Sequence, residues 1–222
     1  MKKKLVCLCL ALMFSFLAAC AGSSPTTLLP GETEATEFMG QQLTPLKEQR
    51  NNALAGTQRL DRETYRLKVS GLVDTPLELT YADLQALPQV SKVLDMNCVE
   101  GWDFTAKWTG PTLKSVFEKA GVKTSANNVI FRTSDALEGG YTSLLLDYVL
   151  TNDIILGMKI NDLTLPAERG FPFQVIAESK FGYKWAKWVT EIELSDDLSF
   201  KGYWESEGYS NNADDQGPPF EP

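Results

Sequence analysis

The patterned part of this chain consists of short segments, and this feature limits most strongly the folds that the chain can adopt. Polar and apolar residues alternate over residues 65–69, which is the period of a half-buried strand, and helix-like patterns are equally brief. These short strands and helices follow one another without the spacing of βαβ units. We therefore predict a single mixed α+β domain rather than a doubly wound parallel sheet.

Capping and stop signals mark two of the expected helices. Thr80, with Asp83 three residues later, forms a capping-box-like start, and Thr112 and Gly121 are placed to cap and to end a second helix. Strands are expected over residues 65–69, 77–79, 90–96, 129–131, 154–160, 173–177 and 188–194, and helices over residues 81–87, 113–120 and 144–150. The third of these strands would place Cys98 at a strand-to-loop junction, where functional residues are often found.

The N-terminus has the features of a lipoprotein signal. Three lysines at positions 2–4 precede an apolar stretch over residues 5–18, which is too short for a comfortable spanning helix, and Leu-Ala-Ala-Cys ends at Cys20. We expect residues 1–19 to be a signal peptide and Cys20 to carry lipid, which would hold an exported protein at the extracytoplasmic face of the cell membrane. An uncleaved helical anchor would give the same topology.

Composition divides the rest of the chain into three parts. Residues 20–42, rich in Ser, Thr, Pro, Gly and Glu, are expected to form a lipid-anchored flexible tether. Residues 43–200 are expected to form the folded domain and residues 201–222 an acidic C-terminal tail. The formal net charge is −8, and loss of the three signal lysines would bring it to −11. An acidic chain without a basic patch argues against nucleic acid as a partner.

Cys98 is the one thiol that these expectations leave free. Cys7 and Cys9 lie in the signal and Cys20 is expected to carry lipid, so Cys98 has no intramolecular disulfide partner. It could be a buried small hydrophobe, a catalytic nucleophile or a ligand of a soft metal. The chain contains no histidine, so the usual Cys–His pairing of a nucleophile is impossible. One cysteine cannot hold a bare metal ion, so a metal here would need a cofactor that supplies most of its ligands.

Motifs around Cys98 and near residue 185 carry a resemblance to a known family. Asn-Cys-Val-Glu-Gly-Trp over residues 97–102 is followed by Trp-Thr-Gly over 108–110 and by Lys-Phe-Gly-Tyr-Lys-Trp-Ala-Lys-Trp over 180–188. Together they resemble the molybdopterin-binding domain of the sulfite oxidase family, most of all its short bacterial branch, which includes periplasmic methionine sulfoxide reductases. The resemblance implies that fold, an oxidoreductase activity, and a molybdenum cofactor, with tungsten as an alternative metal. Cys98 would be the single protein ligand to the metal.

The resemblance also implies roles for further residues in holding the cofactor. Asn51 lies near the place where an asparagine reaches the cofactor, and Thr133 follows an expected strand where a threonine contacts it. The segment with Trp185, Ala186 and Lys187 matches the one that surrounds the pterin phosphate with backbone N–H groups and a lysine. A strand-end threonine bonded to its own backbone, and an ordinary amphipathic strand with exposed lysines, are the structural alternatives.

Tyr141 resembles the active-site tyrosine of the family, whose phenol lies near the substrate oxygen and can donate a hydrogen bond. A packed tyrosine is the alternative. The chain departs from the family at two positions, since Gln174 stands where related enzymes have arginine and Arg169 stands where they have asparagine. Arg169 can restore the missing positive charge near the cofactor phosphate. The neutral Gln174 weakens the case for sulfite as substrate.

Two functions from different classes follow. In the first, a lipid-anchored molybdopterin oxidoreductase transfers an oxygen atom to or from a small sulfoxide, sulfite or similar oxyanion. The chain has no haem-binding histidine and no multi-cysteine cluster, so electrons must be exchanged with a separate partner, such as a membrane cytochrome. In the second, the same fold has no cofactor and is a surface lipoprotein that binds a ligand or a protein. The signal has lysines but no arginine pair for the export of a folded holoenzyme, which favours the second.

Overall fold

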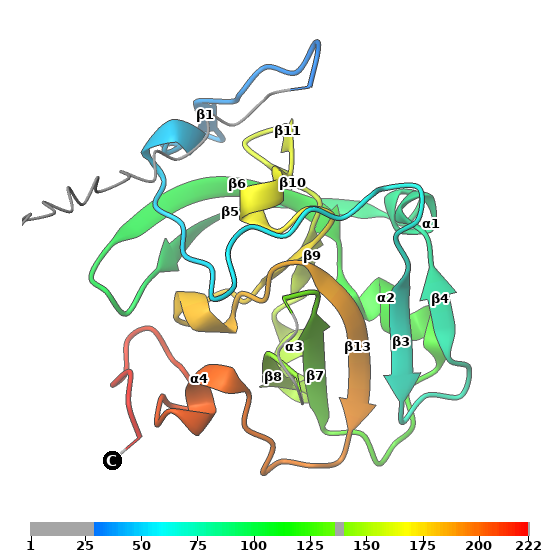
Figure 1. Cartoon of the computed structure of the whole chain (residues 1–222). Coiled ribbons are helices and arrows are strands. Elements are labelled where there is room, and N and C mark those ends of the chain that lie inside the picture. The colour runs from blue at the N-terminus through cyan, green and yellow to red at the C-terminus, as the bar shows by residue number, and fades with distance from the viewer. Residues whose placement is uncertain (1–28, 136–139, 222) are drawn as a thin grey trace, which may run out of the picture.

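The computed structural model describes residues 29–135 and 140–221 (Figure 1). The predicted signal peptide and Cys20 lie outside these residues. Within the part of the chain that is described, no helix is long and apolar enough to cross a membrane.

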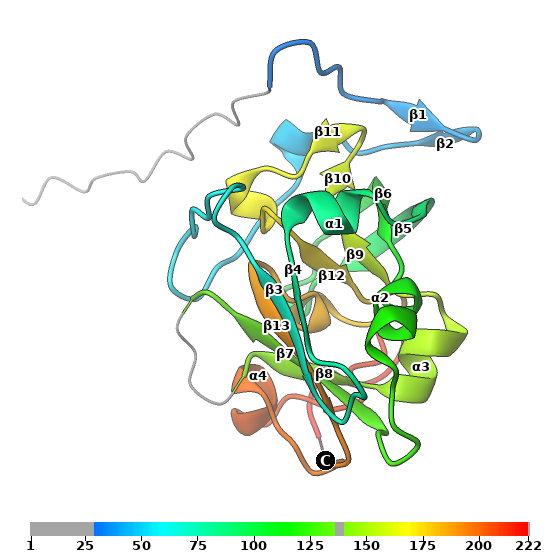
Figure 2. The same ribbon diagram turned by 90° about the vertical axis from the view of Figure 1, so that its right-hand side faces the viewer.

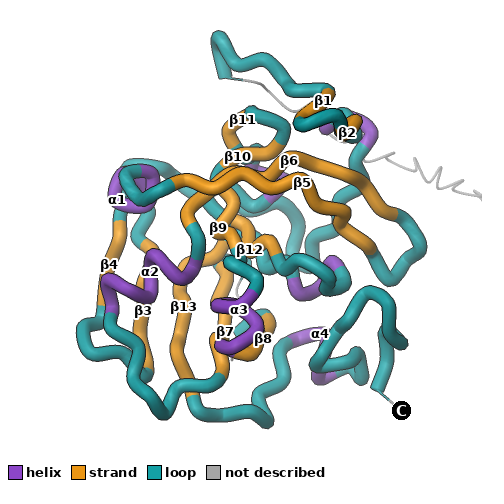
Figure 3. Tube along the Cα trace, turned by 180° about the vertical axis from the view of Figure 1, so that it is seen from behind, coloured by secondary structure: helices purple, strands orange, loops and turns teal. Residues whose placement is uncertain are grey.

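The domain is built around two β-sheets. The first has five strands in the order β4-β3-β13-β7-β8, in which β13 pairs in parallel with β3 and antiparallel with β7. The second has four strands in the order β11-β10-β6-β5. The β5–β6 hairpin lies above the five-stranded sheet in Figure 1, with β9 between them. Helices α2 and α3 lie on the face of the five-stranded sheet that is turned away in Figure 1 and toward the viewer in Figure 3. This arrangement confirms the predicted mixed α+β class.

The bounds of the elements are as follows. The strands are β1 Glu37–Phe38, β2 Gln41–Gln42, β3 Leu67–Gly71, β4 Leu77–Leu79, β5 Gln89–Asn97, β6 Asp103–Pro111, β7 Asn128–Thr133, β8 Thr142–Leu145, β9 Ile155–Gly157, β10 Lys159–Ile160, β11 Leu163–Thr164, β12 Gln174–Ile176 and β13 Val189–Ser195. The α-helices are α1 Tyr81–Gln85, α2 Leu113–Ala120, α3 Leu146–Thr151 and α4 Tyr203–Ser206, and the 3-10 turns are η1 Leu46–Glu48, η2 Ala167–Arg169 and η3 Gly182–Lys184. Figure 2 shows the same elements after a quarter turn.

The capping signals read from the sequence are present. Thr80 and Asp83 form a complete capping box at the start of α1. Thr112 accepts a hydrogen bond from the backbone of Ser115 at the start of α2, and α2 ends at Gly121, whose φ is 66°. These signals are local, so the sequence alone contains all the atoms that form them.

Pairing between strands changes two of the expected elements and adds a third that was not expected. The strand expected over residues 154–160 is two strands, because Met158 separates β9, which pairs with β12, from β10, which pairs with β6. The helix expected over residues 144–150 begins two residues later, since Leu144 and Leu145 belong to β8. Strand β6 was not predicted, although it pairs with β5 along its whole length.

The second half of the tether expected over residues 20–42 is attached to the domain. The Glu32 carboxylate accepts hydrogen bonds from the backbone N–H and the hydroxyl of Thr164, and the Glu34 carboxylate accepts one from the side chain of Asn161. Part of the segment expected as a flexible tether therefore contacts the domain. Composition could not reveal it, because these partners lie 127 and 132 residues away along the chain.

The C-terminal segment (residues 201–221) packs on the domain. The side chains of Lys184 and Glu205 are fully buried and form a salt bridge of 2.5 Å. Lys184 also donates to the carbonyl oxygen of Ser143 at 3.1 Å, and the Glu205 carboxylate accepts a hydrogen bond from the hydroxyl of Thr142. A buried carboxylate requires a cation and donors of this kind, so this segment is an integral part of the fold.

Aromatic packing places the 3-10 turn η3 next to Cys98. Trp108 and Trp185 meet edge to face with ring centroids 5.7 Å apart, and both are buried. At Gly182, an added Cβ would lie 2.8 Å from Sδ of Met96 and 3.9 Å from Cα of Cys98. The lack of a side chain at this position lets η3 approach the end of β5 closely.

Candidate active site

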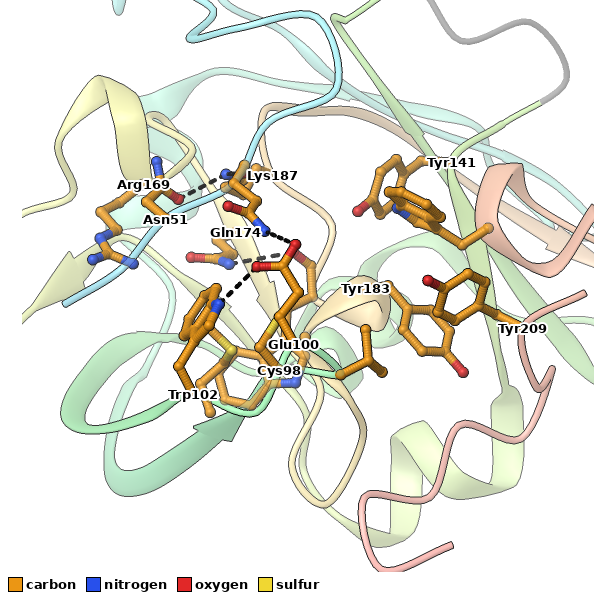
Figure 4. Close-up of a pocket in the computed structure, with 16 residues that line it drawn as sticks. Asn51, Cys98, Glu100, Trp102, Tyr141, Arg169, Gln174, Tyr183, Lys187 and Tyr209 are labelled. Carbon is orange, nitrogen blue, oxygen red and sulfur yellow. Dashed lines mark hydrogen bonds between the residues drawn. The ribbon is translucent and has the colours of Figure 1, made fainter. Parts of the chain in front are cut away.

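Cys98 lies in the tight loop between β5 and β6. Its backbone N–H donates to the carbonyl oxygen of Trp102 at 2.9 Å, and its own carbonyl oxygen accepts from the N–H of Gly101 at 3.0 Å. Gly101 has a φ of 79°, which residues with a side chain rarely adopt. The loop presents the half-buried Cys98 side chain to a cleft (Figure 4), at the strand-to-loop junction that the sequence predicts.

The cleft has an empty volume of about 710 Å³, part of it open to solvent. Seven of the nine residues expected in the site line it: Asn51, Cys98, Tyr141, Arg169, Gln174, Trp185 and Lys187. A neighbouring hollow of about 720 Å³ also has Tyr141 and Lys187 in its lining, so the two spaces are adjacent. The structure therefore brings together residues that are up to 136 positions apart in the sequence.

Thr133 and Ala186 do not line the cleft. The Thr133 hydroxyl, at the end of β7, donates to the carboxylate of Asp135. Ala186 is fully buried, its N–H donates to the carbonyl oxygen of Lys184 at 3.0 Å, and its own carbonyl oxygen accepts from the N–H of Val175 at 2.8 Å. Both residues therefore use these groups within the protein.

Other residues line the cleft that the sequence did not assign to the site. They are Asn52, Met96, Val99, Glu100, Trp102, Gly182, Tyr183, Trp204 and Tyr209. Glu100 and Trp102 stand in the motif around Cys98, so that motif could have indicated them. Trp204 and Tyr209 are large aromatic residues in an otherwise polar C-terminal segment, and this contrast was the only signal for them.

Two cations lie at one end of the cleft and donate to neutral groups. Arg169 is 4% exposed, and its guanidinium donates to the carbonyl oxygens of Gln49 at 2.7 Å and Arg50 at 2.9 Å. Lys187 Nζ donates to the side-chain oxygen of Asn51 at 2.8 Å. Because these acceptors are uncharged, the two positive charges can attract an anion that enters the cleft.

Burial changes the acidity of both cations. It lowers the pKa of Lys187 to about 7, with the positive charge of Arg169 as the second cause. It also lowers the pKa of Arg169 to about 10. An anion bound between them would oppose both shifts, because it favours the charged forms.

We expect the stability of the cofactor-free protein to depend on pH through Lys187. Its pKa falls from 10.5 in the unfolded chain to about 7 in the fold, so the unfolded state binds more protons between these values. The Lys187 contribution to the free energy of unfolding should be complete above pH 10.5 and lost as the pH falls to about 7. Urea unfolding at about pH 7 and about pH 9.5 measures it. The Lys187→Met variant should lack this part of the pH dependence, and an identical dependence in both proteins would contradict the shift.

Gln174 supplies an unpaired acceptor at the same end. Its amide N–H donates to the carbonyl oxygen of Trp185 at 3.2 Å, whereas its buried side-chain oxygen has no partner among the described residues. A buried acceptor without a donor costs about 1–3 kcal/mol. A ligand with N–H groups, such as a pterin ring, would satisfy it.

Opposing effects act on the pKa of the Cys98 thiol. Burial, as the largest cause, raises the pKa of the thiol, and the negative charge of Glu100 acts in the same direction, while the backbone N–H groups of Glu100 and Val99 lower it. These N–H groups favour the charged form of the sulfur. They would stabilise a thiolate once a metal replaced the proton.

Glu100 keeps a negative charge at the mouth of the cleft. Its exposed carboxylate accepts hydrogen bonds from the indole N–H of Trp102 at 2.9 Å and the amide of Asn52 at 3.0 Å. These two donors, the Trp102 indole first, lower the pKa of Glu100. The carboxylate is therefore ionised at neutral pH.

Aromatic residues form the opposite end of the cleft. Figure 4 shows Tyr141, Tyr183 and Tyr209 on one side of Cys98, with Arg169 and Lys187 on the other. Burial, followed by the nearby carboxylates, raises the pKa of Tyr141 well above its ordinary value. The phenol therefore remains protonated and can act as a hydrogen-bond donor, as the sequence predicts.

The residues of the cleft fit a metal that an organic cofactor carries. Among the described residues, no group of three or more His, Cys, Asp or Glu could hold a metal ion. A metal bound through Cys98 would therefore need its other ligands from the cofactor. Arg169 and Lys187 could bind the phosphate of such a cofactor, and Gln174 could accept from its ring N–H groups.

Comparisons with known proteins identify the family of this chain. The sequence profile described as "oxidoreductase molybdopterin binding domain" matches residues 54–204. The chain is 35% identical over 155 residues to the uncharacterized oxidoreductase YuiH of Bacillus subtilis, covering 69% of this chain and 76% of that protein. It is 34% identical over 151 residues to the putative protein-methionine-sulfoxide reductase subunit YedZ1 of Azospira oryzae, covering 68% and 56%. The chain thus spans little more than half of this second relative.

A solved structure shares the fold. The sulfane dehydrogenase SoxCD of Paracoccus pantotrophus superposes with a TM-score of 0.67 at 20% identity, over 84% of this chain and 56% of that chain. The identity is low, so the likeness concerns the fold alone. The resemblance noted in the motifs around Cys98 is confirmed by the profile match. The chain belongs to the family of oxidoreductase molybdopterin-binding domains, the sulfite oxidase type, and this family implies a molybdenum cofactor.

Proposed function

We propose that the protein is an exported molybdenum oxidoreductase that reduces a small sulfoxide. In the reaction the sulfur–oxygen bond breaks, the sulfoxide gains two electrons from a separate redox partner, and the oxygen leaves as water with two protons. The name of the Azospira relative, at 34% identity, and that of the methionine-sulfoxide reductase catalytic subunit MsrP of Campylobacter jejuni, at 24%, support this reaction.

The observation that carries the proposal is the position of Cys98 between two chemically different ends of one cleft. The cations Arg169 and Lys187 lie on one side and Tyr141 lies on the other (Figure 4). A phosphate-bearing cofactor at the cationic end and a small substrate at the other end could therefore both lie next to the Cys98 sulfur.

Each part of the mechanism has a residue in the cleft. Cys98 would hold the metal through its sulfur, with the N–H groups of Val99 and Glu100 stabilising the thiolate. The bound molybdenum cofactor would supply the two-electron exchange with the substrate oxygen. The protonated Tyr141 phenol would donate a hydrogen bond to that oxygen and fix its direction.

Charges in the cleft favour an uncharged sulfoxide over sulfite. Glu100 is ionised beside the entrance, and its negative charge disfavours the approach of an anionic substrate. Gln174 contributes a neutral amide in place of an arginine. Arg169 and Lys187 would be occupied by the cofactor phosphate, so few counter-charges remain for a dianionic substrate.

We also propose that lipid on Cys20 holds the mature protein at the extracytoplasmic face of the membrane, where its electron partner would lie in or near the bilayer. The lysines at positions 2–4, the apolar stretch and the small residues before Cys20 support this location. Fractionation of the native host tests it. Wild-type protein should be found with the membranes, and a Cys20→Ala variant that stays equally membrane-bound would exclude a lipid on this residue as its anchor.

Metal analysis combined with turnover tests the proposed function. We expect protein purified from its own host to contain about one molybdenum per chain and to reduce dimethyl sulfoxide with reduced benzyl viologen as electron donor. Folded protein without molybdenum or tungsten would instead support the cofactor-free binding lipoprotein. A protein with full metal content that oxidises sulfite but reduces no sulfoxide would overturn the assignment of the substrate.

A further inference from the structure

The aromatic end of the cleft is formed largely by the C-terminal segment. Trp204 and Tyr209 come from this segment and are half-buried in the wall of the cleft. The ring of Tyr209 lies edge to face with Trp204 and with Tyr183, at centroid distances of 5.2 Å in both cases. Among the described residues that line the cleft, the only lysine or arginine side chains are Lys187 and Arg169, which lie at the other end.

Trp204 and Tyr209 form what we call the aromatic wall of the cleft. The segment that carries them is attached to the domain where it begins. The N–H of Tyr203 donates to the carbonyl oxygen of Tyr141 at 3.0 Å, and an added Cβ at Gly202 would lie 2.1 Å from that same oxygen. Glu205, the residue after Trp204, forms the buried salt bridge with Lys184. Trp204 is therefore held between two attachment points, and its ring need not be ordered again when a ligand binds.

We propose that Trp204 and Tyr209 determine substrate specificity by binding the apolar substituent of an uncharged sulfoxide. This inference rests on the proposed function and adds the class of substituent. The rings offer apolar faces, and sulfur or aromatic groups gain contact energy against such rings. With the substituent there, the sulfoxide oxygen is directed toward Tyr141 and Cys98, which line the same cleft.

Trp204 and Tyr209 come later in the chain than the residues at the cationic end of the cleft. The family profile ends at residue 204, so Tyr209 lies beyond the matched region. The residues at the cationic end of the cleft all lie within it or just before it.

The test compares two substrates in a variant of the wall and in a control variant. Trp204→Leu removes a ring that lines the cleft. Tyr203→Leu removes a 40% exposed ring of the same short helix that packs edge to face on Trp204 but does not line the cleft, so it controls for loss of that packing. For methyl phenyl sulfoxide, Trp204→Leu should lower kcat/KM about five- to tenfold, mainly through KM. For dimethyl sulfoxide, which has no aryl group, the loss should be clearly smaller, because only the hydrogen bond between Trp204 and Tyr141 is lost, and Tyr203→Leu should behave like the wild type.

Binding of a substrate analogue that is not reduced supplies a second measurement. Calorimetry with methyl phenyl sulfone should give a Kd about five- to tenfold higher for Trp204→Leu, while Trp204→Phe, which keeps a ring, should stay near the wild type. Molybdenum content and circular dichroism should be unchanged. If Trp204→Leu does not fold, Tyr209→Leu takes its place in both measurements.

Distinct outcomes separate the two proposals. Equal losses with both sulfoxides, or unchanged sulfone binding, would overturn the specificity role while sulfoxide reduction stood. A wild-type protein with one molybdenum per chain that reduced neither sulfoxide would overturn the proposed function. Failure of the wild-type protein to bind the sulfone would overturn the aromatic subsite whatever the reaction is.

Discussion

Replacing Cys98 with serine should abolish turnover and leave the fold intact. The sulfur is the one thiol among the described residues, and the proposed metal would have no other protein ligand. Loss of a residue that merely supports a metal ligand costs about 10–100-fold in affinity or activity, so loss of the ligand itself should cost about a hundredfold or more. Cys98 is only half-buried, so the free energy of unfolding should change by less than about 1 kcal/mol.

Molybdenum content, kcat with dimethyl sulfoxide and urea unfolding of the same preparations measure these effects. Met158→Leu is a suitable control, because it removes a buried sulfur that lies outside the cleft and nearly conserves volume. It should keep full metal content and turnover. A Cys98→Ser protein with normal metal content and turnover would show that this sulfur is not the ligand.

Replacing Glu205 with leucine should cause the largest loss of stability. The change leaves the fully buried Lys184 ammonium without its carboxylate, and breaking one side of a buried pair costs about 3–5 kcal/mol. Burial already lowers the pKa of Lys184, so part of the cost should appear as loss of its proton. Urea unfolding at neutral pH measures the free energy, and the double variant with Lys184→Met should recover much of the loss.

A second salt bridge in the same segment provides the matched control. Lys201 and Glu221 are 2.9 Å apart, but their side chains are 46% and 39% exposed. Glu221→Gln should therefore change the free energy of unfolding by less than about 1 kcal/mol. Similar losses in Glu205→Leu and Glu221→Gln would contradict the role of burial. A double variant that is no more stable than Glu205→Leu would also contradict this role.

Local signals allowed several elements to be predicted from the sequence. The capping box of α1 and the glycine stop of α2 use atoms within a few residues of one another. Strand alternation identified β3, because Leu67 and Val69 are buried while Lys68 is exposed. The division of residues 154–160 into β9 and β10 depends on which distant strands pair with each half, and no local pattern contains that information.

The site was predictable where a motif marks it. Cys98, Tyr141 and Lys187 were identified through the resemblance, and the structure places all three in one cleft. Trp204 and Tyr209 were not identified, because their place in the wall depends on the salt bridge between Lys184 and Glu205. Composition classed Glu205 with the exposed acids of a tail. A sequence shows that a carboxylate is present, but only the fold shows which cation lies opposite it.

The docked C-terminal segment has a consequence for biosynthesis. Domains fold as the chain emerges from the ribosome, N-terminal parts first. Asn51, Cys98 and Lys187 are synthesised before Trp204 and Tyr209, so the aromatic wall is the last part of the cleft to be completed. Until this segment has been synthesised and has docked, the cleft lacks this side, and the cofactor-binding residues are reachable from a direction that the docked segment closes.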